Sequence, residues 1–241
     1  MKLRQNNSTQ PQTSNYVHPW DDYVSKNLNK PNPPTPEAVE KQSLKTKPLP
    51  GTGADVIVFD LETNGLLNDA TRIHCISLYS NETNQIESFN DEKYTNNPKD
   101  LPMAGNYSIT TAISWLEVAD YIIGHNIINF DIPVIKKFYT WFNPRGTIID
   151  TLLLSKLYHQ NLFDIDKSKN WPHMPLQLYG RHSLEAYGYR LGEYKGGFGK
   201  TTDWSEWSQD MQDYCEQDVA VTKKLCDHFH PYLSGSKWST R

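Results

Sequence analysis

The sequence predicts an α/β fold, in which a mixed β-sheet is flanked by helices, within residues 54–233 of the 241-residue chain. Short apolar runs rich in β-branched residues are typical of strands that are buried on both faces. Stretches with helical spacing of apolar residues alternate with these runs, and a long helical pattern closes the domain. The hydrophobic share of 37% is ordinary for a globular domain.

Four strands are expected, at 56–59, 73–79, 85–89 and 121–124. The first reads Val-Ile-Val-Phe and the fourth Tyr-Ile-Ile-Gly, so both suit the middle of a sheet. Asn, Asp, Gly and Pro punctuate the segments between the first three strands. We therefore expect these three to form an antiparallel meander.

Five helices are expected, at 111–117, 133–142, 150–159, 183–190 and 209–228. Pro133 suits the first turn of its helix, because an N–H at that position would have no partner within the helix. Since strands and helices alternate along the chain, the helices should pack against the sheet.

The two ends of the chain differ from the predicted domain. Residues 1–53 are expected to form a disordered extension, because residues 1–50 hold eight of the 15 prolines and show no apolar period. An aromatic cluster at 16–24 suits either a docking peptide or a chance cluster in a linker. Residues 234–241 are expected to be a short tail.

Composition excludes several classes of protein. No apolar run is long enough to span a bilayer and the N-terminus lacks the apolar stretch of a secretory signal, so a cytoplasmic location is expected. The cysteines Cys75, Cys215 and Cys226 have no paired short spacing, which indicates free thiols. The net charge of −4 hides a basic segment at 133–200, where ten Lys/Arg face five Asp/Glu. A polyanion suits that segment.

Acidic residues follow two of the predicted strands. Asp60 and Glu62 are two residues apart at the end of the first strand, so both side chains point to one face. Asp131 lies between the fourth strand and a helix, where a helix N-cap is the more ordinary role for the residue taken alone. Tyr214 and Asp218 share one face of the last helix through their i, i+4 spacing. Each signal is weak alone, and their conjunction is informative.

Three segments carry that conjunction in order: Phe-Asp-Leu-Glu-Thr-Asn-Gly-Leu at 59–66, Gly-His-Asn-Ile-Ile-Asn-Phe-Asp at 124–131 and Tyr-Cys-Glu-Gln-Asp at 214–218. They resemble the exonuclease motifs of the DEDD superfamily, also called DnaQ-like, in its tyrosine subclass. The resemblance implies a ribonuclease H-like fold.

Segments 149–157 and 180–193, and the five-residue step from Asn126 to Asp131, are similar to the proofreading domain of family A DNA polymerases from T-odd short-tailed phages. The likeness covers about residues 54–230. No polymerase palm or fingers motif follows. A proofreading domain standing alone is therefore expected, located in the host cytoplasm if a phage encodes it.

The resemblance implies 3′→5′ hydrolysis of DNA with two divalent cations, Mg²⁺ or Mn²⁺, which suit oxygen ligands. Asp60 is expected to bridge the two ions. Glu62 and Asp218 are expected to hold the ion on the side of the attacking water, and Asp131 the other ion. The cations offset the negative charge that develops on the phosphate and the departing oxygen.

Tyr214 is expected to orient the attacking water, because a phenol with a pKa of about 10 is a poor base at neutral pH. The histidine subclass carries His where this chain has Asp213, so the histidine mechanism is excluded. Thr63 and Leu66 match positions that hold the terminal nucleotide, and Asn126 matches a position near the substrate. Leu66 suits the core equally well, and an Asn after a strand, such as Asn126, is more often a turn former.

Other polar and aromatic residues have ordinary roles by default. Asp150 is expected to cap a helix or support the site, outside the set of metal ligands. Trp204, Trp207 and Tyr189 suit base stacking, although core packing is the commoner role. Segment 226–230 contains one Cys and two His, and it is expected to be a helix end with solvent-facing histidines.

Two alternatives remain open. One is an exoribonuclease of the same superfamily, which would recognise the 2′-hydroxyl groups of RNA. The other is a non-catalytic subunit that binds nucleic acid or a polymerase, although all five catalytic-type side chains are present. The expected partners are single-stranded DNA with a free 3′ end and a separate polymerase subunit bound through residues 1–50.

Overall fold

The computed structural model describes residues 53–91, 108–169, 171, 173–193 and 203–234. The predicted extension at 1–53 lies outside these residues except for Gly53, and the predicted tail at 234–241 except for Ser234. The docking role expected for residues 1–50 likewise lies outside the described part of the chain.

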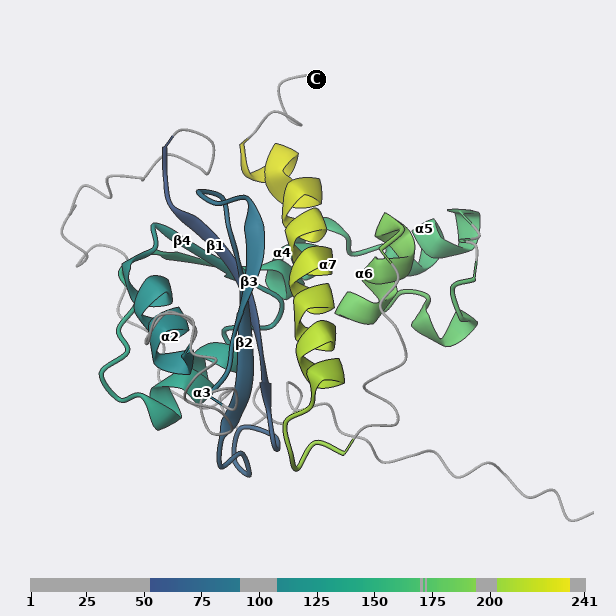
Figure 1. Cartoon of the computed structure of the whole chain (residues 1–241). Coiled ribbons are helices and arrows are strands. Elements are labelled where there is room, and N and C mark those ends of the chain that lie inside the picture. The colour runs from purple at the N-terminus through teal and green to yellow at the C-terminus, as the bar shows by residue number, and fades with distance from the viewer. Residues whose placement is uncertain (1–52, 92–107, 170, 172, 194–202, 235–241) are drawn as a thin grey trace, which may run out of the picture. The chain divides into compact units, whose positions relative to one another are not determined.

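A five-stranded mixed sheet forms the centre, in the order β3-β2-β1-β4-β5 (Figure 1). The strands are β1 (Val56–Thr63), β2 (Ile73–Ser80), β3 (Gln85–Phe89), β4 (Tyr121–Gly124) and β5 (Thr147–Asp150). Both β1–β2 and β2–β3 are antiparallel, which confirms the predicted meander. Next to it, β4 lies parallel to β1 and β5 parallel to β4. The carboxyl ends of β1, β4 and β5 therefore meet at one edge.

Strand β5 was not predicted. No element was predicted at 147–149 and a helix was expected from Asp150, whereas Asp150 ends β5 and helix α4 begins at Thr151. Only Ile148 and Ile149 of its four residues are apolar and both are half-buried, so its apolar run is too short to be recognised. Its pairing with β4, from Tyr121 opposite Thr147 onward, stabilises the extended conformation.

The described residues form seven helical segments. They are α2 (Ile109–Val118), α3 (Asp131–Phe138), α4 (Thr151–Tyr158), α5 (Leu162–Lys169), the 3-10 turn Leu176–Leu178, α6 (Leu184–Leu191) and α7 (Gln209–Leu233). Ser108, Ser183 and Ser208 cap α2, α6 and α7 by accepting backbone N–H groups in the first turn. Helix α3 ends four residues earlier than predicted, and α5 was not predicted.

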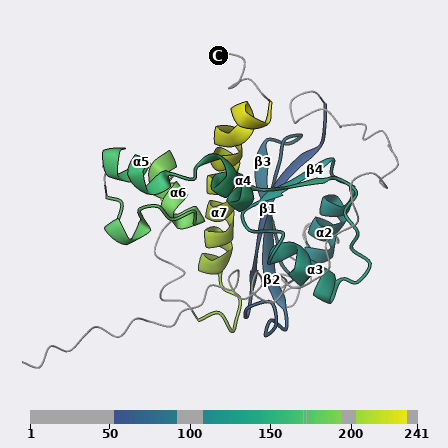
Figure 2. The same ribbon diagram turned by 180° about the vertical axis from the view of Figure 1, so that it is seen from behind.

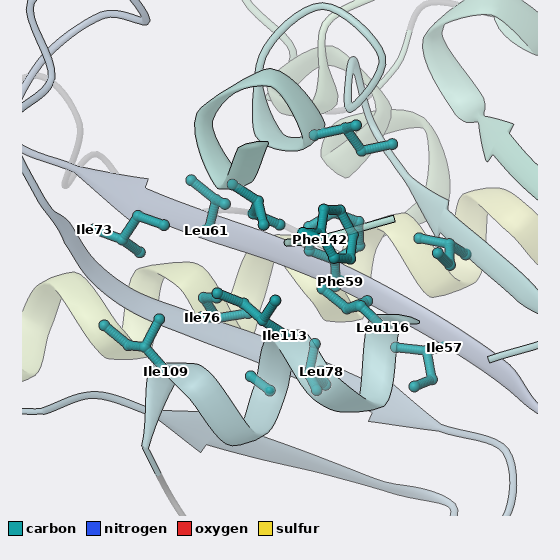
Figure 3. Packing of buried hydrophobic residues seen from close by; sticks show 14 of the residues in the cluster. Ile57, Phe59, Leu61, Ile73, Ile76, Leu78, Ile109, Ile113, Leu116 and Phe142 are labelled. Atoms are coloured by element: carbon teal, nitrogen blue, oxygen red, sulfur yellow. The ribbon is translucent and has the colours of Figure 1, made fainter. Parts of the chain in front are cut away.

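The two faces of the sheet are covered by different helices, α2 and α3 on one side and α7 on the other (Figures 1 and 2). Ile57, Phe59 and Leu61 of β1 point into the core shared with α2 and α3, where Figure 3 shows them beside Ile113 and Leu116. The alternate β1 residues Val56 and Val58 pack with Val219 of α7. Because a strand alternates with period two, Asp60 and Glu62 belong to the α7 face.

Helices α5 and α6 lie on the side of α7 away from the sheet and pack against it together with α4 (Figure 1). The core that they share with α7 includes Leu162, Tyr187, Leu225 and Phe229. Helices α5 and α6 hold α7 between themselves and the sheet, so they fix the helix that carries Tyr214 and Asp218.

Within the described residues, no helix is both long and apolar enough to cross a membrane.

Candidate active site

The site lies at the sheet edge where parallel strands β1 and β4 end. Ligands of α/β proteins commonly bind at the carboxyl ends of parallel strands. Gly124 ends β4 in a tight turn, where a Cβ would lie 2.1 Å from Cγ2 of Ile127 and 3.0 Å from the carbonyl oxygen of Phe59. A glycine is therefore required for the segment after β4 to pass this close to β1.

Asp60 and Glu62 converge with a third potential ligand, Cys215 of α7. One ligand atom from each residue, the sulfur and two carboxylate oxygens, lies within 4.8 Å of the others. The Sγ of Cys215 is 3.4 Å from the carbonyl oxygen of Asp60 and 3.8 Å from its Oδ2. Cys215 was predicted only to be a free thiol, as the structure confirms. Cys215 and Asp218 are three residues apart on a predicted helix, so the sequence already placed both on one helix face.

Asp131 is the most deeply buried carboxylate of the predicted set, 3% exposed at the start of α3. Burial raises the pKa of Asp131 to about 7, and the carboxylates of Asp150 and Asp218 add to the rise. The backbone N–H groups of Asp131 itself and of Leu61 hydrogen-bond to the carboxylate and oppose the rise. Asp131 is thus tied to β1 and faces the acidic residue of α7.

The alternative of Asp131 as a helix cap is wrong, because Phe130 occupies the N-cap position and no side chain caps α3. An acid in the first turn interacts favourably with the helix dipole. That interaction does not require burial, so burial of Asp131 needs another explanation.

We expect Asp131→Asn to stabilise the cation-free protein at alkaline pH. Between pH 4 and 7 the folded protein holds a proton on Asp131 that the unfolded chain has lost, so wild-type stability falls as the pH rises through this window. The variant lacks this fall and should be more stable by a few kcal/mol at pH 8 in EDTA, since one pKa unit corresponds to about 1.4 kcal/mol. Urea unfolding at pH 5 and pH 8 measures it. An equal difference at both pH values would contradict the burial argument.

Helix α7 brings the last two predicted residues to this edge. Asp218 is buried at 6% exposure, and Tyr214 is half-buried with its ring 6.2 Å from that of Trp204 in an edge-to-face contact. Asp213, at the position of the histidine in the other subclass, is exposed and accepts a hydrogen bond from Gln209. Asp213 therefore belongs to the surface of the helix.

Asp150 organises the turn that precedes Asp131. Its carboxylate accepts the backbone N–H groups of Asn126 at 2.9 Å, Ile128 at 3.2 Å and Leu152 at 2.9 Å. The predicted roles of capping and support are both confirmed, because the bond to Leu152 caps α4 and the other two hold the turn. Asn126 has a φ of +68°, and its side chain accepts a hydrogen bond from Asn129. Its observed role is thus that of a turn former.

An apolar cleft of about 330 Å³ adjoins Glu62. Its lining consists of Glu62, Thr63, Gly65, Leu66, Phe130 and Trp204. Leu66 is 74% exposed, so the alternative that it is a core residue is wrong. Thr63 is buried and donates a hydrogen bond to the carbonyl oxygen of Gly65 at 2.7 Å. Phe130 was not predicted to line a site, although it directly precedes Asp131.

The loop that carries Leu66 is held by Lys137 of α3. Its Nζ donates to the carbonyl oxygens of Leu67 at 3.0 Å, Asn68 at 3.1 Å and Ala70 at 2.7 Å. This lysine belongs to the predicted basic segment, so part of that charge serves the fold. Arg190 of the same segment is also used internally, in an ion pair with the buried Asp166.

The remaining predictions on aromatic and histidine residues have mixed outcomes. Trp204 and Trp207 both pack against the buried cluster of Cys75, Met211 and Cys215, and Trp204 also lines the cleft. The expectation of solvent-facing histidines at 226–230 is right for His230, which is exposed. It is wrong for the half-buried His228, whose Nε2 lies 2.7 Å from that of His159. A pair 69 residues apart has no local sequence signal. Tyr189 is half-buried on α6.

The carboxylates fit divalent cations. Asp60 lies beside Glu62, and Asp131 lies close enough to Asp218 for their charges to interact. The backbone of Leu61, between Asp60 and Glu62, bonds to Asp131, and Cys215 of α7 contacts Asp60, so the two pairs of carboxylates belong to one site. Burial is the main reason that the pKa of Asp131 is raised, and repulsion from the carboxylates of Asp150 and Asp218 adds to it. Bound cations would offset that repulsion, and oxygen ligands suit Mg²⁺ or Mn²⁺.

A model of the RNase_H superfamily matches residues 57–230. The chain is 32% identical to the DNA-directed DNA polymerase of Escherichia phage T7, over 71% of this chain and 26% of the polymerase. It is 31% identical to the polymerase of Enterobacteria phage T3, with the same coverage. The chain thus spans about a quarter of the length of these curated relatives.

Solved structures give more distant likenesses. Brucella melitensis NrnC bound to pGG is 15% identical with a TM-score of 0.46, over 77% of this chain and 78% of that one. Escherichia coli exonuclease I in a complex with single-stranded DNA is 17% identical with a TM-score of 0.43, over 77% of this chain and 43% of that one. The family match and the mixed sheet flanked by helices confirm the predicted ribonuclease H-like fold class.

Proposed function

We propose that this chain, which belongs to the ribonuclease H superfamily, is a metal-dependent 3′→5′ exonuclease that removes nucleotides from DNA ends. The observation that carries the proposal is the meeting of three sequence motifs at one sheet edge. Asp60 and Glu62 face α7, and Asp131 lies close enough to Asp218 for their charges to interact. The similarity to phage DNA polymerases supports DNA as the substrate and proofreading as the setting.

Asp60, Glu62, Asp131 and Asp218 would hold two divalent cations, which supply an activated water and stabilise the departing 3′ oxygen. Tyr214 orients that water through its hydroxyl, from a ring position fixed by Trp204. Asp150 keeps the turn before Asp131 in place through its bonds to Asn126 and Ile128. These residues hold the reacting groups in line, which is a large part of the catalysis of phosphodiester cleavage.

The apolar cleft receives the terminal nucleotide. Leu66 stands exposed at its rim and wedges beside the last base, while the backbone near Thr63 holds the sugar. Trp204 and Phe130 offer aromatic surface on which any base can stack. Asn126 contributes at the substrate side through the turn that it forms. A single-stranded or mismatched 3′ end is favoured, because a base that is paired within a duplex cannot reach Leu66 or stack on Trp204 and Phe130.

A digestion assay tests this function. A 5′-labelled single-stranded DNA and the matching RNA are incubated with Mg²⁺, Mn²⁺ or EDTA. We expect a ladder that shortens from the 3′ end of the DNA and depends on the cation. Preferential loss of RNA would establish the exoribonuclease alternative. No cleavage of either strand by folded protein that binds DNA would establish the non-catalytic alternative.

A separate polymerase chain, bound through residues 1–50, stays a prediction. Pull-down of the polymerase with the full chain and with a chain that lacks residues 1–50 measures this interaction. Equal recovery with both would refute a docking role for that segment.

Lys137→Met is expected to raise KM for single-stranded DNA by about 3- to 10-fold with a smaller change in kcat, because the cation no longer holds the loop of Leu66. Lys136→Met is the matched control, since Lys136 is an exposed neighbour on the same helix. Steady-state kinetics at constant salt measures the difference. Equal KM values for the two variants would show that Lys137 does not position the cleft.

A further inference from the structure

One donor at the site is of a different chemical kind from the carboxylates. The Sγ of Cys215 belongs to the same group of converging atoms as the oxygens of Asp60 and Glu62. Cys215 is fully buried on α7, and its thiol donates to the carbonyl oxygen and to the carboxylate of Asp60. A thiolate is a soft ligand, whereas Mg²⁺ takes hard oxygen ligands.

The distances suit a small thiophilic ion. In a tetrahedral zinc site with bonds of about 2.3 Å to sulfur and about 2.1 Å to oxygen, the sulfur and oxygen atoms are about 3.6 Å apart. The Sγ of Cys215 is 3.8 Å from Oδ2 of Asp60, so this pair needs almost no movement. Glu62 is half-buried and its side chain has three rotatable bonds, so it can close the remaining gap from within 4.8 Å.

We propose that Cys215, Asp60 and Glu62 form a binding site for a thiophilic divalent cation, Zn²⁺ or Cd²⁺, which competes with Mg²⁺ for the carboxylates. On binding, the S–H bond of Cys215 breaks, its proton leaves to the buffer, and the sulfur electron pair forms the bond to the cation. No oxidant or reductant is needed. Occupation of Asp60 by such an ion inhibits the enzyme, and this consequence alone rests on the proposed function.

The sulfur of Cys215 lies beside the carboxylates that would bind Mg²⁺, so a hard cation and a soft cation compete for the same oxygen ligands. With Mg²⁺ the thiol keeps its proton and only donates to Asp60, because sulfur is a poor ligand for a hard cation. With Zn²⁺ or Cd²⁺ the sulfur of Cys215 becomes a ligand. Cys215 thereby adds affinity for soft cations, while the oxygen ligands of Asp60 and Glu62 stay the same.

Cd²⁺ titration of the full, metal-free chain tests the binding without any nuclease assay. A bond between thiolate and Cd²⁺ gives an ultraviolet charge-transfer absorption. We expect this absorption to saturate at one Cd²⁺ per chain, to be displaced by Zn²⁺ and by a large excess of Mg²⁺, and to be lost in Cys215→Ala and Cys215→Ser. Cys226→Ser is the matched control and should keep the absorption, because Cys226 lies in a separate cluster with Val56 and Tyr121.

Several results would overturn the proposal. One is the absence of the absorption in wild type. Another is its persistence in both Cys215 variants while circular dichroism shows native folding. Loss in Cys226→Ser with retention in Cys215→Ala would assign the binding to another thiol. In the digestion assay at fixed Mg²⁺, Cd²⁺ should inhibit wild type at a concentration at least about tenfold lower than Cys215→Ala, each relative to its own activity. Absorption without any nuclease activity would refute the proposed function and leave the metal site standing.

Discussion

Asp60→Ala is expected to reduce the rate of DNA digestion by at least about 10³-fold, which corresponds to about 4 kcal/mol of lost transition-state stabilisation. Asp60 lies at the centre of the site, next to Glu62 on β1 and in contact with Cys215 of α7. Removal of its carboxylate would deprive both cations of a shared ligand. Because Asp60 is half-buried and is not a member of the main hydrophobic core, the fold should persist.

The rate is measured on a 5′-labelled single strand at saturating Mg²⁺, with thermal unfolding of each variant recorded in parallel. Asp69→Ala is the control, since Asp69 is an exposed acid in the loop after β1. Its activity should match that of wild type. More than about a tenth of wild-type activity in Asp60→Ala would remove Asp60 from the proposed mechanism.

The second large effect is on stability and concerns the buried ion pair in the layer of α5 and α6. Asp166 is fully buried and accepts hydrogen bonds from Nε and Nη2 of Arg190, Nε1 of Trp171 and the N–H of Gly180. Burial alone would raise the pKa of Asp166, but the bonds from Arg190 and Gly180 outweigh it and lower the pKa. The carboxylate thus joins α5, the segment after it and α6.

Asp166→Asn should lower the free energy of unfolding by about 3 to 5 kcal/mol at pH 7, because Arg190 would stay buried without its counter-charge. The lowered pKa also means that the pair stabilises the protein above the unfolded pKa and that this contribution is lost as the pH falls through the folded pKa. The difference in the free energy of unfolding between wild type and Asp166→Asn should therefore become smaller in strong acid. Urea unfolding across this range measures it.

Asp164→Asn is the matched control for this prediction, since Asp164 lies two residues away on α5 and is exposed. It should change stability by less than about 0.5 kcal/mol. Equal stability of the two variants would mean that the ion pair contributes no more than a surface charge.

The parts of the fold that sequence could predict are those with strong local patterns. The meander of β1, β2 and β3 follows from apolar runs separated by turn residues, and α7 follows from its long period. Asp60 and Glu62 share one face because side chains alternate along a strand. Tyr214 and Asp218 share one face because they are four residues apart on a helix. These regularities depend on neighbours in the chain, so the sequence contains them in full.

The parts that sequence missed depend on distant contacts. Helix α5 has few apolar residues, and Asp166 within it is fixed by Arg190, 24 residues away. Lys137 holds a loop from which it is separated by about 70 residues. Cys215 meets Asp60 across 155 residues. None of these contacts leaves a periodic trace, because each involves single side chains brought together by the packing of the sheet against α7.

The separation of 155 residues between Asp60 and Cys215 affects how the protein folds. The carboxylates on β1 and the residues on α7 cannot cooperate until the chain has closed a loop of this length, so no short fragment contains the cation site. Closing such a loop makes folding slower than in proteins with local contacts. A cation that binds the folded chain alone shifts the folding equilibrium, by about 2.7 kcal/mol at a concentration 100 times its Kd. Divalent cations would thus act as stabilisers of the completed fold, whatever their part in chemistry.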